Sequence, residues 1–151
     1  MCLDNDRVDS FDTNVYIEAI QVGPTADSYQ LLLSTLPRTY LSAVVVQELY
    51  TGTLDAFGAR LVGTFVHQVE KTGRTVVPTS RDWKEVGKLL ARISRQEPAP
   101  RTRLPRLVND VLLAMSARQI GATLFTFNEA DFRLIARYKR FSLKILSCRR
   151  S

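Results

Sequence analysis

The chain has 151 residues, of which 45% are hydrophobic and 24% are charged. These values are typical of one soluble domain with a single hydrophobic core, and the longest apolar runs are too short for a membrane-spanning helix. The formal net charge of +6 favours a negatively charged partner such as a nucleic acid.

The two ends of the chain bear on its compartment. The N-terminal segment contains acids and has no apolar core, so we expect no signal peptide. Cys2 and Cys148 show no metal-type spacing and no disulfide framework. These features together predict a cytoplasmic protein. We expect a single domain over residues 1–151, with residues 1–6 poorly ordered.

The first half of the chain predicts strands that alternate with helices. A strand is expected at 7–14, although Asp9 weakens its apolar pattern, and a second short strand at 39–41. Ser42 follows the second strand and is a good N-cap for the next helix. Apolar residues at helical spacing predict helices at 15–22, 26–36, 43–50 and 54–73.

The second half continues this alternation. Helices are expected from about residue 80 to 95 with Trp83 facing the core, from Pro105 to a terminating Gly121, and at 129–138. Strands are expected at 74–79, 122–127 and 141–146, the last at an edge. The pattern predicts an α/β fold, with a mainly parallel sheet of about four or five strands flanked by helices.

Asp110 is the unusual residue of its helix. Three of its four neighbours one turn away, Leu107, Leu113 and Ala114, are apolar, so its carboxylate lies at the edge of the core-facing side. A half-buried carboxylate is costly unless it is paired or binds a cation. From the helix alone, two interpretations stay open: a surface ion pair with Arg106, or a functional site.

Four acids are expected near the carboxyl edge of the parallel sheet, where such folds bind ligands. They are Asp12 after the first strand, Glu48 in the helix after the second, Asp110 before the fourth and Asp131 after the fourth. Carboxylates that lie close together need cations, and Mg²⁺ and Mn²⁺ prefer such oxygen ligands. These metals support phosphodiester cleavage, and a basic surface attracts the nucleic-acid backbone, so the pattern favours a nuclease.

Three segments resemble the signature blocks of PIN-domain ribonucleases, and most of all those of VapC-type toxins from bacterial toxin–antitoxin pairs. They are DTNVYI (12–17), VVVQELYTG (44–52) and NDVLLAMSARQIGATLFTFNEADF (109–132). Their order and spacing fit the family over nearly the whole chain. The first strand departs from the family because it is less apolar than usual.

The resemblance implies a PIN-like domain that hydrolyses RNA with Mg²⁺ or Mn²⁺. The implied catalytic acids and metal ligands are Asp12, Glu48, Asp110 and Asp131, with Glu129 as an alternative to Asp131. The implied supporting residues are Thr13, Asn14, Thr126 and Asn128. The resemblance also implies a cognate antitoxin and a homodimer, for which residues 31–33 and 44–46 are either contacts or core.

Other functions stay open at this point. A PIN-type nuclease that processes RNA without an antitoxin would carry the same acids. A non-catalytic nucleic-acid-binding module would keep the fold but have altered acids, and here none of the four is altered. A phosphatase of another α/β family would have a second aspartate where this chain has Asn14. The sequence specifies neither the RNA target nor the number of metal ions.

Overall fold

The computed structural model describes residues 7–98 and 103–147, in which strands and helices alternate. The strands are β1 (Val8–Phe11), β2 (Thr39–Ser42), β3 (Thr75–Val76), β4 (Ala122–Thr126) and β5 (Ser142–Ile145). The helices are α1 (Thr13–Val22), α2 (Asp27–Thr35), the 3₁₀ turn η1 (Leu36–Arg38), α3 (Ala43–Thr51), α4 (Ala56–Glu70), α5 (Ser80–Gln96), α6 (Leu104–Gln119) and α7 (Glu129–Tyr138). The expectations about residues 1–6, Cys2 and Cys148 lie outside the described residues.

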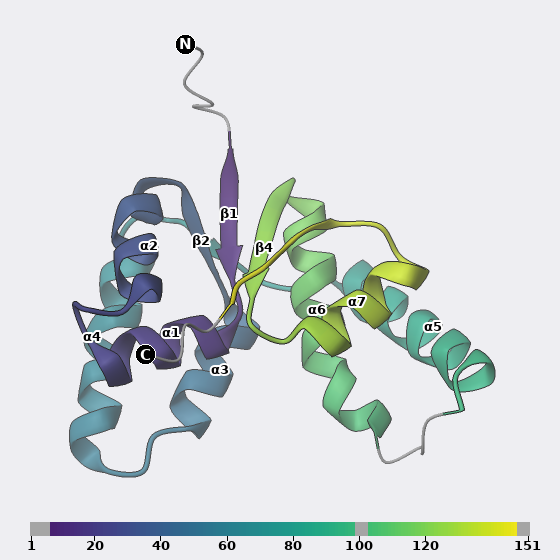
Figure 1. The fold of residues 1–151 in the computed structure, drawn as a ribbon, viewed down its shortest axis with the longest axis horizontal. Coiled ribbons are helices and arrows are strands. Elements are labelled where there is room, and N and C mark those ends of the chain that lie inside the picture. The colour runs from purple at the N-terminus through teal and green to yellow at the C-terminus, as the bar shows by residue number, and fades with distance from the viewer. Residues whose placement is uncertain (1–6, 99–102, 148–151) are drawn as a thin grey trace.

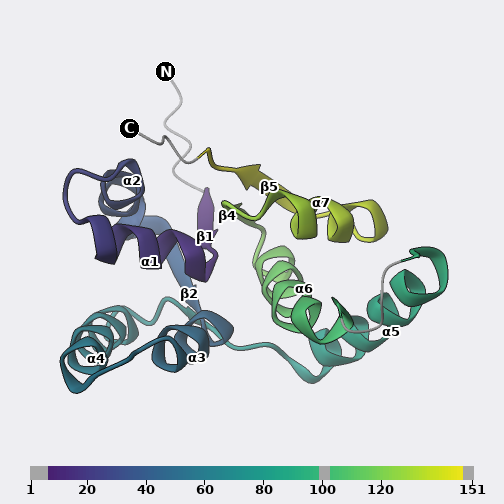
Figure 2. The ribbon, with the colours of Figure 1, turned by 60° about the horizontal axis from the view of Figure 1, so that its bottom comes forward.

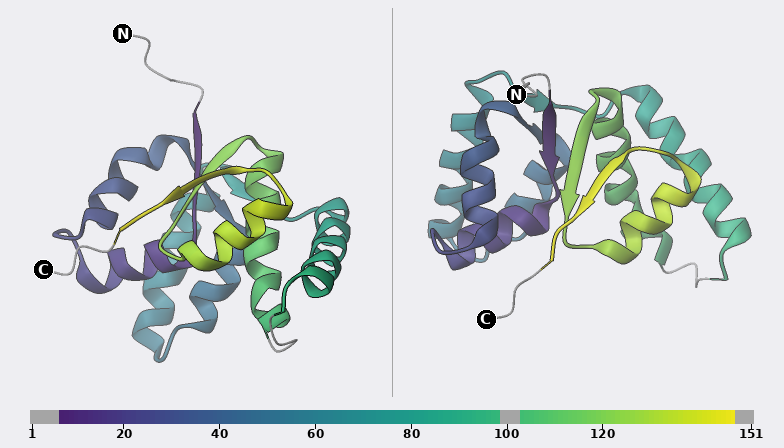
Figure 3. Two further views of the ribbon diagram at one scale, coloured as in Figure 1. Left: turned by 45° about the vertical axis from the view of Figure 1, so that its right-hand side comes forward. Right: turned by 45° about the horizontal axis from the view of Figure 1, so that its top comes forward.

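The five strands found in the described residues form one parallel sheet in the order β3-β2-β1-β4-β5. In its middle, β1 pairs with β4, from Val8 opposite Ala122 to Phe11 opposite Phe125. Helices α1–α4 lie on one side of the strands and α5–α7 on the other (Figures 1 and 2). As predicted, β5 lies at an edge, beside β4 (Figure 3). The expected α/β fold is confirmed.

Three strands lead almost directly into helices at the carboxyl edge of the sheet. Asp12 caps α1 after β1, Ser42 caps α3 after β2, and Asn128 caps α7 after β4. Each cap side chain accepts a hydrogen bond from a backbone N–H near the start of its helix, a group that the helix itself leaves without a partner. The caps therefore fix where the helices carrying the predicted site residues begin.

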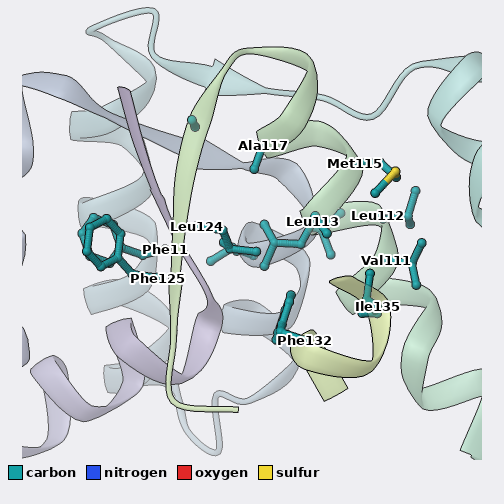
Figure 4. Packing of buried hydrophobic residues seen from close by; sticks show 14 of the residues in the cluster. Phe11, Val111, Leu112, Leu113, Met115, Ala117, Leu124, Phe125, Phe132 and Ile135 are labelled. Atoms are coloured by element: carbon teal, nitrogen blue, oxygen red, sulfur yellow. The ribbon is translucent and has the colours of Figure 1, made fainter. Parts of the chain in front are cut away.

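The hydrophobic core lies on both sides of β4. On one side Phe11 and Phe125 stack with their ring centroids 4.8 Å apart (Figure 4). On the other side Leu124, Leu113 and Phe132 join β4 to α6 and α7 (Figure 4). A strand buried on both faces needs a nearly continuous apolar sequence, which explains the run of apolar residues at 122–127.

Two predicted strands are shorter than expected. β1 ends at Phe11 instead of continuing to residue 14, because Asp12 already caps α1. β3 has only two residues, Thr75–Val76, and Pro78 beyond it has no N–H to contribute to a strand. No helix within the described ranges is both long and apolar enough to cross a membrane.

The prediction that Trp83 faces the core is wrong. Its side chain is 55% exposed. The helix begins at Ser80, as expected, after the N-cap Thr79, whose side chain forms a capping box with Asp82. Trp83 lies beside the buried face of α5, which contains Asp82, Val86, Leu89 and Ile93.

Candidate active site

Asp12 is held at the end of β1 by two hydrogen bonds. One carboxylate oxygen accepts the N–H of Thr13 at 2.7 Å, and the other accepts the Thr126 hydroxyl at 2.7 Å. The side chain is only 6% exposed. Burial, reinforced by the nearby charge of Glu48, raises the pKa of Asp12 to about 6 despite these hydrogen bonds. Asp12 is thus a fixed, buried carboxylate of raised basicity.

Glu48 reaches the same region from α3. One of its oxygens accepts a hydrogen bond from the Thr13 hydroxyl, and the other accepts one from the Asn109 side-chain amide at 3.0 Å. Thr13 therefore contacts both Asp12 and Glu48. Sequence reasoning did not single out Asn109, although it directly precedes Asp110 in the third signature segment.

Asp110 faces these acids from α6 without a described partner. Within residues 7–98 and 103–147, no hydrogen bond or ion pair involves its carboxylate, so the alternative of a surface pair with Arg106 is not seen. Burial, followed by the charges of Asp12, Asp131 and Glu48, raises the pKa of Asp110 to about 8. Asp12, Asp131 and Glu48 are therefore close enough to Asp110 to repel its charged form.

Asp131 differs from the other acids because a positively charged arginine side chain, that of Arg103, binds it. One oxygen accepts a hydrogen bond from the Arg103 guanidinium at 2.6 Å, and the other accepts one from the Asn128 amide at 3.1 Å. Partial burial works to raise the pKa of Asp131, but these two bonds and the charges of Arg103 and Arg106 bring it below its ordinary value. No local sequence pattern predicts the contact between Arg103 and Asp131.

Glu129, the alternative to Asp131, pairs with a basic residue of its own helix. It is exposed and accepts a hydrogen bond from Arg133 at 2.7 Å, one helical turn along α7. Asp131, in contrast, acts electrostatically on Asp110. The structure thus supports Asp131 as the fourth member of the acidic group.

The remaining predicted residues join the ends of β1 and β4. The Thr126 hydroxyl donates to Asp12 and accepts the N–H of Asn128 at 2.9 Å and the amide of Asn14 at 3.3 Å. The side-chain oxygen of Asn14 accepts the N–H of Phe127 at 3.4 Å. These bonds fix the orientation of the Asp12 carboxylate and couple the two strands that carry the site.

The acidic group has the chemistry of a divalent cation site. Its donors are carboxylate oxygens, which hard cations prefer. Burial and then repulsion by the other acids raise the pKa of Asp110, and a bound cation would offset both effects. In the described residues, however, no three acidic, histidine or cysteine side chains converge closely enough to ligate one ion. Hydrogen bonds from Thr13, Thr126, Asn109 and Arg103 hold three of the acids. The residues fit a metal by type and charge.

The PIN domain family matches residues 11–138, well over half of the sequence. The chain belongs to the PIN domain family. This assignment agrees with the parallel sheet and with the acids gathered at its carboxyl edge. No curated protein matches the sequence.

Solved structures similar to this PIN domain share its fold at low sequence identity. VapBC2 from Rickettsia felis, bound to a promoter DNA fragment, has 19% identity and a TM-score of 0.66, covering 93% of this chain and 99% of the other. FitAcB from Neisseria gonorrhoeae has 20% identity and a TM-score of 0.66, with coverage of 89% and 94%. VapBC-5 from Mycobacterium tuberculosis, a member of the VapBC family of toxin–antitoxin systems, has 16% identity and a TM-score of 0.54, with coverage of 93% and 98%.

Proposed function

We propose that this PIN domain is an endoribonuclease that depends on Mg²⁺ or Mn²⁺ and is the toxin of a type II toxin–antitoxin pair. The environment of Asp110 carries the proposal. Its carboxylate is half-buried and repelled by three other acids, and no basic group among the described residues pairs with it. Such repulsion lowers the stability of the folded protein. A binding site for a cation explains why the acids are nevertheless placed close together.

Asp12, Glu48 and Asp110 would hold the metal, with Asp131 as the fourth acid of the group. When bound, Mg²⁺ or Mn²⁺ lowers the pKa of an attacking water and neutralises charge on the scissile phosphate. Thr13 and Thr126 hold two of the carboxylates in fixed orientations, and the acids would have to move closer together to share one ion. A histidine base is not required, and His67 is exposed on α4.

The charge distribution favours a nucleic-acid substrate, and membership of the PIN domain family points to RNA. The chain carries a formal net charge of +6, although its site is acidic. A positive surface attracts the phosphate backbone and tolerates many sequences, while the acidic group supplies the chemistry. Arg103 and Arg106 place positive charge at the start of α6, close enough to lower the pKa of Asp131.

An antitoxin and a second copy of the chain are the proposed protein partners, in the cytoplasm. The likeness to VapBC and FitAcB supports this part of the proposal. A mainly apolar cavity of about 440 Å³ lies between α1, α2 and α4, and its lining includes Ile20 and Leu33, which are 47% and 54% exposed. The exposed residues of this cavity, which include part of the segment 31–33, are the better candidate for a contact with a partner protein. The segment 44–46 is a weaker candidate for such a contact, because Val44 and Val45 are buried in the core.

Cleavage of a pool of structured RNAs tests the proposed activity. Purified protein is assayed with Mg²⁺ or Mn²⁺ and with EDTA, beside Asp110→Asn and the matched surface control Glu129→Gln. We expect metal-dependent cutting that falls at least about 100-fold in Asp110→Asn and is unchanged in the control. Cutting that survives both EDTA and Asp110→Asn contradicts the carboxylate site. An inactive wild type that still binds RNA points to a non-catalytic binding module.

The toxin assignment has a separate test. The product of a small neighbouring reading frame is co-expressed with the tagged chain, and its co-purification and inhibition of cutting are measured. Inhibition supports an antitoxin. An active nuclease with no such neighbour, or with a neighbour that leaves cutting unchanged, favours an RNA-processing nuclease that works without one.

A further inference from the structure

Asp131 is held differently from the other three acids, because an arginine side chain binds its carboxylate. Its two carboxylate oxygens accept separate hydrogen bonds, one from Arg103 at 2.6 Å and one from Asn128 at 3.1 Å. Asn128 in turn accepts the N–H of Asp131 at 3.3 Å, so the side chain is also tied to the start of α7. A carboxylate held in this way is suited to orienting a cationic side chain.

The Arg103 side chain has N–H donors that no described residue uses. A guanidinium has five N–H donors in a planar fork, and the contact with Asp131 is the one hydrogen bond found for this side chain within the described residues. The side chain is 39% exposed, so it is accessible to solvent next to Asp131. Arg103 is thus held by Asp131 and keeps donors that no described residue uses.

The local structure of α6 does not explain why an arginine lies at its N-terminus, at position 103. Arg103 is the N-cap of α6, and its side chain makes no capping hydrogen bond. A positive charge at a helix N-terminus opposes the helix dipole. The pair also differs from Arg133–Glu129, whose side chains are 64% and 59% exposed on the outside of α7, because Asp131 is only 24% exposed and acts on Asp110.

We propose that Arg103 binds a phosphate of the RNA backbone at the nuclease site, and that Asp131 is a positioning residue that holds Arg103 there. This inference rests on the proposed function. Arginine suits the task because its fork can bind two phosphate oxygens while keeping its bond to a carboxylate. On this proposal Asp12, Glu48 and Asp110 serve the metal. Asp131 serves the substrate through Arg103.

The test compares Arg103→Ala, Arg103→Lys, Asp131→Asn, the double variant Arg103→Ala/Asp131→Asn, and the matched control Arg133→Ala. Three quantities are measured: single-turnover RNA cleavage with Mn²⁺, RNA affinity in EDTA between about 50 and 200 mM salt, and Mn²⁺ affinity. Circular dichroism verifies that each variant is folded, and Arg103→Lys retains the charge if Arg103→Ala is unstable.

We expect Arg103→Ala to slow cleavage by about 10- to 100-fold and to reduce the salt dependence of RNA binding by about one unit of slope. Mn²⁺ affinity should stay within about twofold, since Arg103 is not a ligand. Asp131→Asn should act in the same direction, and the double variant should be no slower than Arg103→Ala, because both changes remove one function. Arg103→Lys should recover part of the loss, and Arg133→Ala should match the wild type.

Two results overturn the inference. One is an Arg103→Ala variant that binds and cuts RNA like Arg133→Ala. The other is faster cutting by Arg103→Ala together with a loss of Mn²⁺ affinity in Asp131→Asn, which would make Asp131 a ligand that Arg103 blocks. Failure of the proposed function is recognised separately, from a wild type that does not cut. In that case the RNA-binding comparison of Arg103→Ala with Arg133→Ala alone decides whether Arg103 binds phosphate.

Discussion

The hydroxyl of Thr13 donates a hydrogen bond to the carboxylate of Glu48, 35 residues further along the chain. The backbone N–H of the same threonine donates to Asp12. One residue at the start of α1 therefore links the acid that follows β1 to the acid on α3. This link sets the relative positions of two of the proposed metal ligands.

Replacing Thr13 by valine tests that link. Valine keeps the shape and the backbone N–H but removes the hydroxyl, so Glu48 loses a donor while Asp12 keeps its own. We expect Mn²⁺ affinity and the cleavage rate each to fall by about tenfold, as when outer partners of metal ligands are removed. The control is Thr64→Val, at an exposed position of α4. Equal activity of the two variants would show that the Thr13 hydroxyl does not position Glu48.

The stability of the metal-free protein should fall as the pH rises from about 4 to about 8. Burial and neighbouring acids raise the pKa of Asp12 to about 6 and that of Asp110 to about 8. In this window the unfolded chain has released protons that the folded chain still holds, so the folded state binds more protons. The free energy of unfolding then decreases with pH, by at most about 1.4 kcal/mol per pH unit for each proton.

Asp110→Asn isolates the larger part of this pH effect. The variant cannot ionise at position 110, so its free energy of unfolding should depend less on pH between about 6 and 8 and should exceed that of the wild type at about pH 9. Urea unfolding in EDTA across this range measures the effect, with Glu129→Gln as the control. A wild type that becomes more stable over the range would contradict the raised pKa of Asp110.

Asp9 shows how the chain accommodates a buried acid inside β1. Its side chain is completely buried, and Arg38 binds one carboxylate oxygen at 2.7 Å while Arg7 lies 3.4 Å from the other. Arg38→Ala should lower the free energy of unfolding by about 2 kcal/mol or more, since it leaves a buried carboxylate with one weaker partner. Urea unfolding measures this loss, and Arg60→Ala, at an exposed position of α4, is the control. A change in Arg38→Ala no larger than the control would show that Arg7 alone is sufficient.

The helices and strands were largely predictable because their signals are local. Ser42 was identified as a cap from the sequence, and Gly121 was expected to end its helix, which agrees with its φ of 68°. The four acids could be placed near one another because parallel strands bring their carboxyl ends to one edge. That rule needs only the order of the elements.

The contacts around the acids were not predictable, because they depend on packing between distant segments. Arg103 and Asp131 lie 28 residues apart, and Asn109 and Glu48 lie 61 residues apart. No periodicity relates such pairs. Trp83 was misplaced for a related reason, since apolar spacing cannot show which edge of an amphipathic helix the neighbouring α6 covers.

We propose that Asp12, Glu48 and Asp110 together bind a divalent cation. Calorimetric titration with Mn²⁺ at about pH 8, where protons compete with the metal less than at neutral pH, tests it on the wild type, Asp110→Asn and Glu129→Gln. We predict that the wild type and Glu129→Gln bind Mn²⁺ alike and that Asp110→Asn binds it at least about tenfold more weakly. A wild type that binds no Mn²⁺, or an Asp110→Asn variant that binds it equally well, would contradict the account.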